Sequence, residues 1–409
     1  MSVDPVILGR QEHGLSRRAI DSDALKVLYR LHNHGYKAYL VGGAVRDLLL
    51  GRRPKDFDVV TDARPGEIKK LFKNAFLIGR RFRLAHIRFR GGKIIEVATF
   101  RREAEEDDSG DIHNTFGTAS EDAFRRDITI NALFYDIATF SIIDYVGGLQ
   151  DLRQGVVRVI GEPSIRFQED PIRILRVLRH AARLKFSIQD ATAHAICPAR
   201  ELIASCSGAR IYEEFSKDMN SGYLMPVVAL MDLYGILSQI FGAVGTFMAN
   251  DPGAMAKITD CLACIDERVL NGQTFNPEVI LAVLFSPWAG HVLHHGPERG
   301  DRGKIIHDAF MESGMQATVP KTVRSNCIQI LLIVEAMQVA MQTGRFPWSL
   351  RKRAFYKDAT WIFALLFNRE LLQESDPFSV AFTQRHPQTT RPRRRRRRSS
   401  RRAKMRSSQ

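Results

Sequence analysis

The chain has 409 residues, a hydrophobic content of 44% and a formal net charge of +15, which exclude both a small stapled peptide and a wholly unfolded polymer. No apolar run approaches the ~20 residues that cross a bilayer, so the sequence predicts no membrane span. Five cysteines, and an N-terminus without a long apolar core, predict a protein of a reducing compartment, the cytoplasm.

The first 160 residues alternate between runs typical of strands and amphipathic runs typical of helices. The expected helices are 24–34, 44–51 and 64–72. The expected strands are 37–43 and 56–61, followed by a hairpin over 85–100 that turns at Gly91 and Gly92. Because strands alternate with helices, this part of the chain is predicted to fold as a mixed α/β domain.

Beyond residue 161 the strand signals fade and helical patterns dominate. These patterns cover 171–184, 211–219, 226–237, 277–285 and 328–341. The apolar pattern ends near residue 376, and residues 391–409 hold ten arginines, one lysine and no acid. Removing these eleven charges from the total leaves +4 for the first 390 residues, so most of the charge lies in the tail. A segment this polar is predicted to be disordered.

We therefore expect an α+β protein in which a mixed α/β head precedes an all-helical region. The expected segments are an N-terminal arm (1–23), the head (24–160), a helical neck (161–220), a helical body (221–375) and the disordered, arginine-rich tail (376–409).

The stretch LVGGAVRDLLLGRRPKDFDVV (40–60) combines glycines, a cation and two acids. Residues i and i+2 of a strand face the same way, so Asp56 and Asp58 are expected to project together. Parallel carboxylates repel each other unless a cation lies between them, and Mg²⁺ fits because it accepts carboxylate and phosphate oxygens. Gly42 and Gly43 allow close backbone approach, the helix that follows offers N–H groups to an anion, and Arg46 is placed to reach the same phosphates. The alternative is a surface loop with solvated charges.

Glu96 is an acid inside the otherwise apolar strand pattern KIIEVATF (93–100). A buried carboxylate without a partner is costly, so we expect Glu96 to be a third metal ligand. The alternative is a glutamate on an edge strand that faces water.

Four stretches together resemble the class II nucleotidyltransferases, the family of bacterial poly(A) polymerases and CCA-adding enzymes. They are the stretch at 40–60, RRDITINAL (125–133), DYVGGLQDLRQGVVRVIG (144–161) and EDPIRILRVLRHAARL (169–184). The resemblance covers residues 20–220 in motif detail. It implies that the head has the DNA polymerase beta-type nucleotidyltransferase fold and that a helical neck and body follow it.

The same resemblance implies a two-metal transfer reaction. Asp56 and Asp58 would hold two Mg²⁺ while an RNA 3′-hydroxyl attacks the α-phosphate of a nucleotide and pyrophosphate leaves. Asp127 would belong to the active site and, with Asn131, would lie near the ribose. The triphosphate would be faced by two arginines, Arg125 and Arg126. Asp127 also fits the N-cap of a helix over ITINALFY, and this alternative stays open.

The segment 169–184 has two stripes at helical spacing. The polar stripe is Asp170, Arg173, Arg176 and His180, and the core-facing stripe is Ile174, Leu175, Leu178, Ala181 and Ala182. The resemblance makes Asp170 and Arg173 a pair that reads the base of the nucleotide through hydrogen bonds, and it places Arg176 in the same nucleotide site. The alternative is an ordinary amphipathic helix with Asp170 as N-cap before Pro171.

Three features favour a poly(A) polymerase within this family. They are LIGRRFRLAHIRF (77–89), the arm at 10–31 and the arginine-rich tail, which would bind RNA irrespective of its sequence. The basic turn also fits a solvated surface, and the tail also fits a solubilising extension. We predict template-independent addition of AMP from ATP to RNA 3′ ends, those of mRNA and other transcripts, with RNA-decay proteins as candidate partners. CCA addition to tRNA stays the alternative.

Two alternatives belong to other functional classes: a zinc-binding protein and a non-catalytic RNA-binding protein. Cys261 and Cys264 form a C-x-x-C with His291 and His294 downstream, but the spacing is not that of a zinc finger and the segment fits a core helix. A non-catalytic RNA-binding protein with an inactive head is the other alternative. The intact aspartate pair Asp56 and Asp58 argues against it.

Overall fold

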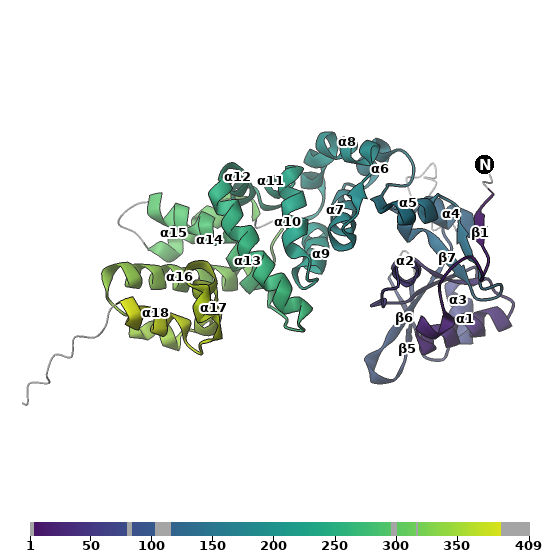
Figure 1. Cartoon of the computed structure of the whole chain (residues 1–409), viewed down its shortest axis with the longest axis horizontal. Coiled ribbons are helices and arrows are strands. Elements are labelled where there is room, and N and C mark those ends of the chain that lie inside the picture. The colour runs from purple at the N-terminus through teal and green to yellow at the C-terminus, as the bar shows by residue number, and fades with distance from the viewer. Residues whose placement is uncertain (1–3, 80–83, 103–115, 296–300, 316–317, 386–409) are drawn as a thin grey trace, which may run out of the picture. The chain divides into compact units, whose positions relative to one another are not determined.

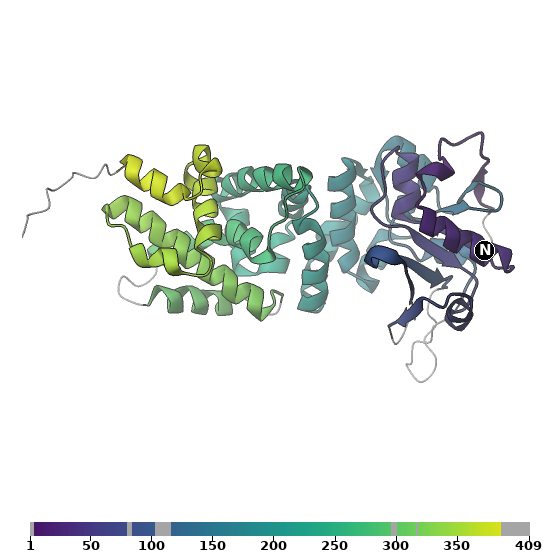
Figure 2. The same cartoon turned by 90° about the horizontal axis from the view of Figure 1, so that it is seen from below.

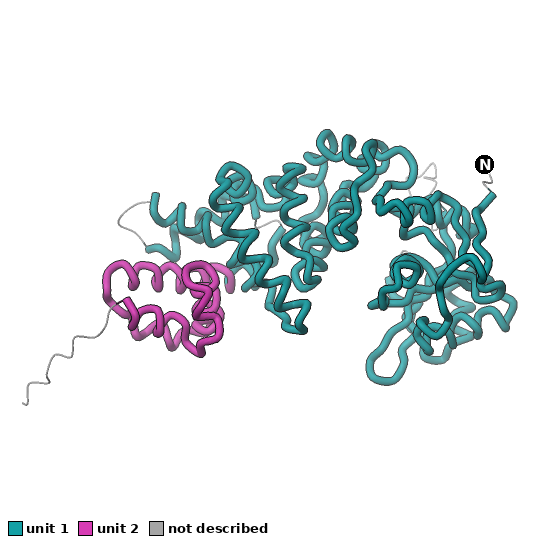
Figure 3. Tube along the Cα trace, viewed as in Figure 1, with its two compact units in different colours: residues 1–325 teal, residues 326–409 magenta. Residues whose placement is uncertain are grey.

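The computed structural model describes residues 4–79, 84–102, 116–295, 301–315 and 318–385. The arginine-rich tail, the turn at 80–83 and most of the polar segment 101–118 lie outside the described residues. The chain divides into two compact units, residues 1–325 and residues 326–409, coloured teal and magenta in Figure 3.

A mixed sheet organises the beginning of the first unit, as predicted. Within the described residues it has eight strands in the order β1-β8-β7-β2-β3-β6-β5-β4 (Figure 1). Neighbours β3 and β6 run parallel and the other pairs are antiparallel. The strands are β1 (Val6–Leu8), β2 (Ala38–Val41), β3 (Asp58–Thr61), β4 (Ala75–Ile78), β5 (Leu84–Arg88), β6 (Ile94–Thr99), β7 (Leu133–Asp136) and β8 (Ile142–Asp144).

Short helices connect and cover these strands. They are α1 (Ser22–Asn33), α2 (Gly43–Leu49), α3 (Pro65–Leu71), α4 (Ala119–Phe124) and α5 (Gly148–Gln154). Helix α1 buries an apolar stripe against β2, β3 and β6 (Figure 2). On another part of the sheet, Val60 and Ala98 pack with Phe134 and with Ala119 and Ala123 of α4. Because side chains alternate along a strand, Asp58 and Glu96, two residues earlier on β3 and β6, share the face of Val60 and Ala98.

The rest of the first unit is helical, as predicted, apart from a two-stranded pairing of β9 (Val156–Val157) with β10 (Ser187–Ile188). The helices up to residue 250 are α6 (Pro163–Glu169), α7 (Ile172–Leu184), α8 (Asp190–Ala199), α9 (Gly208–Met219), α10 (Leu224–Leu233), α11 (Leu237–Phe241) and α12 (Ala243–Asn250). Those that follow are α13 (Pro252–Leu270), α14 (Pro277–His295) and α15 (Arg302–Glu312). The core-facing stripe predicted for 171–184 is buried on α7.

The second unit is also helical. Its helices are the larger part of α16 (Lys321–Thr343), α17 (Tyr356–Phe367) and α18 (Pro377–Arg385), with the short turns η6 (Trp348–Lys352) and η7 (Arg369–Gln373). By length and composition α16 is apolar enough to cross a membrane, which corrects the expectation that no such run exists. Half of its apolar window is buried in the protein, as in the core helix of a soluble fold.

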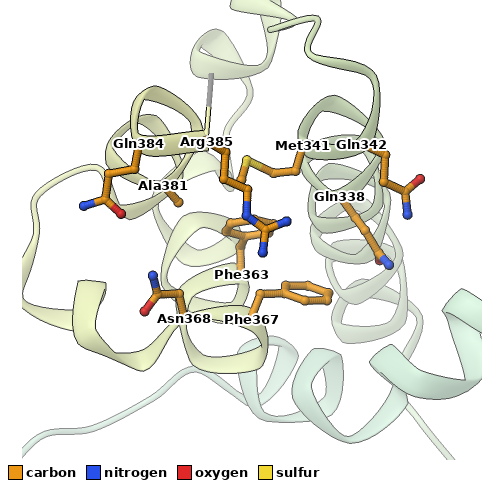
Figure 4. Close-up of a pocket in the computed structure, with 9 residues that line it drawn as sticks. All are labelled: Gln338, Met341, Gln342, Phe363, Phe367, Asn368, Ala381, Gln384 and Arg385. Carbon is orange, nitrogen blue, oxygen red and sulfur yellow. The ribbon is translucent and has the colours of Figure 1, made fainter. Parts of the chain in front are cut away.

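The three helices of this unit enclose a pocket of about 230 Å³ (Figure 4). Phe363 and Phe367 lie at its base and Arg385 points toward its middle. The other lining residues are Gln338, Met341, Gln342, Asn368, Ala381 and Gln384. No carboxylate lines this pocket, so it is not the site at which two aspartates would hold a metal.

Two local interpretations were wrong, and the N-terminal arm adds a strand to the sheet. Strand β3 begins at Asp58, so Asp56 lies in the loop before the strand and not on it. The segment ITINALFY forms a single 3-10 turn, Thr129–Asn131, followed by β7, so Asp127 caps no α-helix there. The N-terminal arm contributes β1, which pairs with β8 and extends the sheet of the head.

Candidate active site

A row of three polar side chains crosses the sheet at the beginning of β3. Asp58 is directly opposite Glu96 in the parallel pair of β3 and β6, and Glu96 is opposite His86 in the antiparallel pair of β6 and β5. His86 Nε2 lies 3.2 Å from Glu96 Oε1. Directly opposite residues share one face of a sheet, so the register alone brings these groups together. Sequence analysis identified Asp58 and Glu96 but missed His86, which had no local signal.

The carboxyl of Asp58 has a raised pKa. Desolvation by the surrounding protein, followed by repulsion from Glu96 and Asp56, raises its pKa to about 6, while the charge of Arg126 lowers it. The residue still reaches solvent at the end of the strand, as does Asp56 in the preceding loop. A bound cation would relieve this repulsion, because it would give the clustered carboxylates an opposite charge to face.

The carboxylate groups present are suitable ligands for the predicted metal, but the protein alone does not provide a complete set of ligands. Asp58, Asp56 and Glu96 offer carboxylate oxygens, the ligands that Mg²⁺ accepts. Within the described ranges, however, no three or more His, Cys, Asp or Glu side chains are grouped closely enough to hold a metal ion. Magnesium often takes only one or two carboxylates and completes its shell with water and substrate phosphate oxygens. The residues therefore fit a metal that is bound together with its nucleotide.

The glycine turn after β2 lies next to this row. Gly42 has φ 73°, a left-handed conformation that favours glycine, and a side chain there would face Arg126 Nη1 at 3.6 Å. Arg126 is held by Asp122, whose Oδ2 accepts from Nε and Nη2 at 3.1 and 2.8 Å. Arg125 Nη1 lies 3.9 Å from the same aspartate. The turn and Arg126 thus lie near Asp58, whose raised pKa is partly lowered by the charge of Arg126.

Arg46 and Asn131, which were predicted near the phosphates and the ribose, bind each other in the structure. Arg46 is 5% exposed, and its Nη1 donates to Asn131 Oδ1 at 2.6 Å while its Nε donates to Asp47 at 2.8 Å. Asn131 Nδ2 in turn lies 3.1 Å from His180 Nε2. Burial, followed by the charge of Arg46, lowers the pKa of His180 well below its usual value, so this imidazole is neutral. Arg46, Asn131 and His180 thus connect α2, the turn before β7, and α7.

Asp127 is held between two arginines of α7. Its Oδ1 accepts from Arg173 Nε at 3.2 Å, and its Oδ2 lies 2.7 Å from Arg176 Nε. Arg173 Nη1 also donates to Glu169 Oε2 at 2.9 Å and to the carbonyl of Arg166 at 2.8 Å. These contacts place the predicted polar stripe of α7 against the loop that carries Asp127.

The expected base-reading pair, Asp170 and Arg173, lies at the start of α7, but the two side chains do not bind each other. Both carboxylate oxygens of Asp170 lie 3.0 Å from Arg210 Nη2 on α9. Asp170 Oδ1 also accepts from the backbone N–H of Ile172 at 3.3 Å, but the N-cap of α7 is Pro171 and not, as the alternative had it, Asp170. Sequence analysis missed Arg210, because nothing in its own neighbourhood distinguishes it from other surface arginines.

A buried ion-pair network joins α7 to α9. Arg179 donates to Asp218 at 2.7 Å and to Glu214 at 2.6 Å, and Asp218 is wholly buried. Burial raises the pKa of Asp218 despite the attraction of Arg179. Burial also pushes up the pKa of Glu214, but hydrogen bonds from Lys217 and Arg179 outweigh it and lower that pKa. Arg176 Nη1, 3.8 Å from Glu214, links this network to Asp127.

The cysteine and histidine residues weighed as a zinc site lie on two core helices. Cys261 is buried and Cys264 half-buried on α13. His291 on α14 packs against Phe247 and stacks on His295 with ring centroids 4.3 Å apart. Within the described part of the chain they form no group that could hold a metal ion, and Cys261 packs in the core of the helical region.

Comparison with known families covers most of the first unit. Residues 38–158 match the family described as "Poly A polymerase head domain". Residues 185–245 match "Probable RNA and SrmB- binding site of polymerase A". These ranges contain the carboxylate row, the glycine turn and Asp127, and then α8–α11.

Individual relatives extend this likeness. Poly(A) polymerase I of Salmonella typhi is 38% identical over 375 residues, covering 86% of this chain and 80% of the relative. The CCA-adding enzyme of Bacillus pumilus is 41% identical over 202 residues, about half of each chain. A solved tRNA nucleotidyltransferase, complexed with a primer tRNA and an incoming ATP analog, superposes with a TM-score of 0.63 at 25% identity, covering 88% of this chain and 98% of that one. The α+β architecture and the resemblance predicted from the sequence are thereby confirmed, and the chain belongs to the bacterial poly(A) polymerase I family.

Proposed function

We propose that this polynucleotide adenylyltransferase transfers AMP from ATP to RNA 3′-hydroxyls at the row formed by Asp56, Asp58 and Glu96. The observation that carries the proposal is the register of β3 and β6, which sets Asp58 beside Glu96. Desolvation, together with repulsion from Glu96 and Asp56, raises the pKa of Asp58 to about 6, and this supports the binding of a cation by the group of carboxylates.

In this proposal Asp56 and Asp58 hold two Mg²⁺, and Glu96, oriented by His86, is a further oxygen donor. When bound, the two ions supply charge stabilisation at the attacking 3′-hydroxyl oxygen and the departing pyrophosphate oxygen. Gly42 and Gly43 let the backbone approach the triphosphate without a side chain in the way. Arg125 and Arg126, both anchored by Asp122, face its negative charge.

The nucleotide base is read at the start of α7. Asp170 would accept and Arg173 would donate hydrogen bonds to the edge of the adenine, with Arg176 beside them. Asp127 would orient the ribose while it holds both arginines. Asn131 and Arg46 act by positioning other groups of the site. Their hydrogen bonds to each other and to His180 join the glycine turn to α7.

Replacing Arg173 with alanine is expected to reduce the preference for ATP over CTP by roughly 1–3 kcal/mol of discrimination, because a base-contacting donor is lost. The measurement compares kcat/KM for the two nucleotides with the same RNA. Arg173→Lys, which keeps the charge but loses the planar fork, should fall in between. Unchanged selectivity with only a lower melting temperature would show that Arg173 is structural.

Deleting residues 391–409 is expected to weaken RNA binding and to flatten its salt dependence. The deleted segment carries eleven cations, and single strands lose about 0.7 in log–log slope for each phosphate contact. The measurement is RNA affinity of full-length and truncated protein across a salt series. If the full-length and truncated proteins have equal salt slopes and equal RNA affinities, the arginines of the tail do not bind RNA.

The function itself is tested by incubating the full chain with labelled, unstructured RNA and each nucleotide separately. We expect a ladder of added residues with ATP and little extension with CTP. The second candidate, CCA addition, has support in the CCA-adding enzymes that match half of the chain, and it predicts three-nucleotide products on tRNA alone. Absence of any RNA-dependent pyrophosphate release would favour the non-catalytic alternative.

The setting of this activity follows from its substrates. RNA 3′ ends and ATP are both available in the cytoplasm, where we propose that the enzyme works, with proteins of RNA decay as candidate partners. None of the five cysteines forms a disulfide in the described part of the chain, which suits a reducing compartment.

A further inference from the structure

The second unit carries an aromatic cluster that ends at the surface. Phe346 stacks on Phe378 with centroids 5.3 Å apart, and Phe378 meets Phe363 edge-on at 5.1 Å. Phe378 is fully buried, so this end of the cluster belongs to the core. At the other end, Phe346 meets Trp348 at 4.2 Å, and Trp348 is 61% exposed. An indole this exposed is unusual, because a large apolar ring normally gains by burial.

Trp348 is nonetheless held by the residues around it. The guanidinium of Arg351 lies over its ring at 5.0 Å and over that of Phe346 at 5.4 Å. Arg351 is itself fixed by Asp376 at 2.8 Å and by the hydroxyl of Ser379. The indole thus has a supported side and an open side, and a ligand that covers the open side need not order a mobile tryptophan first.

The sequence around Trp348 is strongly basic. Residues 336–357 contain five cations and no acid. Arg345, Lys352 and Arg353 are exposed, and among the described residues none has an acidic side chain within ion-pairing distance. Among the described residues, Arg351 is the only one of the five cations that forms an ion pair with an acid, Asp376, and it is also the residue that supports the indole. The remaining charges therefore point to an anionic ligand.

We propose that Trp348, with Arg345, Lys352 and Arg353, is a stacking platform for single-stranded RNA, distinct from the nucleotidyl transfer site. One base of the RNA substrate stacks on the open side of the indole, and the three cations contact the flanking phosphates. An exposed aromatic ring within a basic surface is how proteins bind single strands irrespective of sequence, since every base has a stacking face. The proposal rests on the proposed function, which requires RNA as substrate, and assigns part of its binding to η6 and its flanks.

Tryptophan fluorescence tests the stacking directly. Trp288 is 5% exposed and Trp361 is half-buried, so Trp348 is the exposed one of the three tryptophans. Oligo(A) should quench the emission of the full chain, and the same strand in a duplex should not. Trp348→Phe should lose most of this quenching, whereas the control Trp361→Phe should keep it. Quenching that survives in Trp348→Phe overturns the proposal.

Binding affinity tests the energetic role. Trp348→Ala should weaken oligo(A) binding on the order of tenfold, because one stacked base is lost. The control Leu270→Ala removes another exposed apolar side chain and should change little. Lys352→Ala/Arg353→Ala should lower the salt slope by about 0.7 for each lost phosphate contact. The exposed pair Arg302→Ala/Lys304→Ala makes the same change in charge on α15, and a loss no greater than that of this control overturns the proposal.

These measurements need neither ATP nor metal, so they fail independently of the proposed activity. If the chain binds oligo(A) through Trp348 but releases no pyrophosphate, the stacking platform is supported and the proposed polyadenylation activity is rejected. If the Trp348→Ala variant polyadenylates RNA and binds it with unchanged affinity, the proposed activity is supported and the stacking platform is rejected. In that case the exposed indole would be left as a surface for a protein partner.

Discussion

Asp58→Ala and Asp56→Ala are each expected to lower AMP transfer by on the order of 10³-fold or more. A two-metal site that loses a ligand loses both the ion and the alignment of the attacking hydroxyl. The measurement is RNA-dependent pyrophosphate release at saturating ATP and Mg²⁺. Asp62→Ala is the matched control, because Asp62 is an exposed carboxylate just beyond the other end of β3. Activity near that of the unchanged protein in either variant would remove that residue from the mechanism.

Asp58→Asn separates chemistry from folding. It should be as inactive as Asp58→Ala, yet in the presence of a chelator it should unfold at a higher temperature than the unchanged protein at pH 7. The folded-state pKa of Asp58, about 6, lies above its ordinary value of 3.8, so between these values the folded state binds more protons. The folded state therefore loses stability as pH rises from about 4 to 6. The asparagine variant avoids this loss, and its advantage should disappear near pH 4.

The second large effect is expected from Arg179→Met. The substitution leaves Asp218, wholly buried, and Glu214 without the cation that holds both. Breaking a buried ion pair from one side costs about 3–5 kcal/mol of folding free energy, since an uncompensated charge remains in the interior. Because unfolding releases about 2.1 cal/mol/K of entropy per residue, we expect the melting temperature of a unit of this size to fall by about 4–7 °C. Thermal unfolding followed by circular dichroism measures this change.

Arg210→Ala is the control for the same pair of helices. Arg210 bridges α9 to Asp170 at the start of α7, but its side chain is 54% exposed. Exposed pairs contribute about 0–1 kcal/mol, so little stability should be lost. If Arg210→Ala and Arg179→Met lower the free energy of unfolding equally, burial does not determine how much these ion pairs contribute to stability. The double variant Arg179→Met/Asp218→Leu removes both charges and should recover part of the lost stability.

The local elements of this protein follow from residue patterns alone. The apolar run AYLV, ended by Gly42, predicts β2, and the run DFDVVT predicts β3, although that strand begins only at Asp58. The stripe on 171–184 likewise predicts which face of α7 is buried. These features are set by side-chain period and by the cost of burying charge, so they can be read from neighbouring residues.

The exceptions are local as well. Asp127 precedes a 3-10 turn and a strand where a helix also fitted the residues. Leu133, Phe134 and Tyr135 of this segment lie on β7 between β2 and β8, and this tertiary contact outweighs a marginal capping signal. Strand β1 is similar, because three residues of an arm become a strand only when β8 offers an edge.

The assembly of the site was decided by tertiary structure. The parallel pairing of β3 with β6, across 38 positions of sequence between Asp58 and Glu96, places the carboxylates opposite each other, and the pairing of β6 with β5 adds His86. Helix packing brings Arg210 to Asp170 and Arg46 to Asn131 and His180, residues separated by 40, 85 and 134 positions. The sequence by itself determined the strands that carry Asp58 and Glu96 and the helix that carries Arg173 and Arg176. Their partners depend on strand register and helix packing, which are fixed by the summed burial of distant apolar faces and leave no signature next to the residues that they bring together.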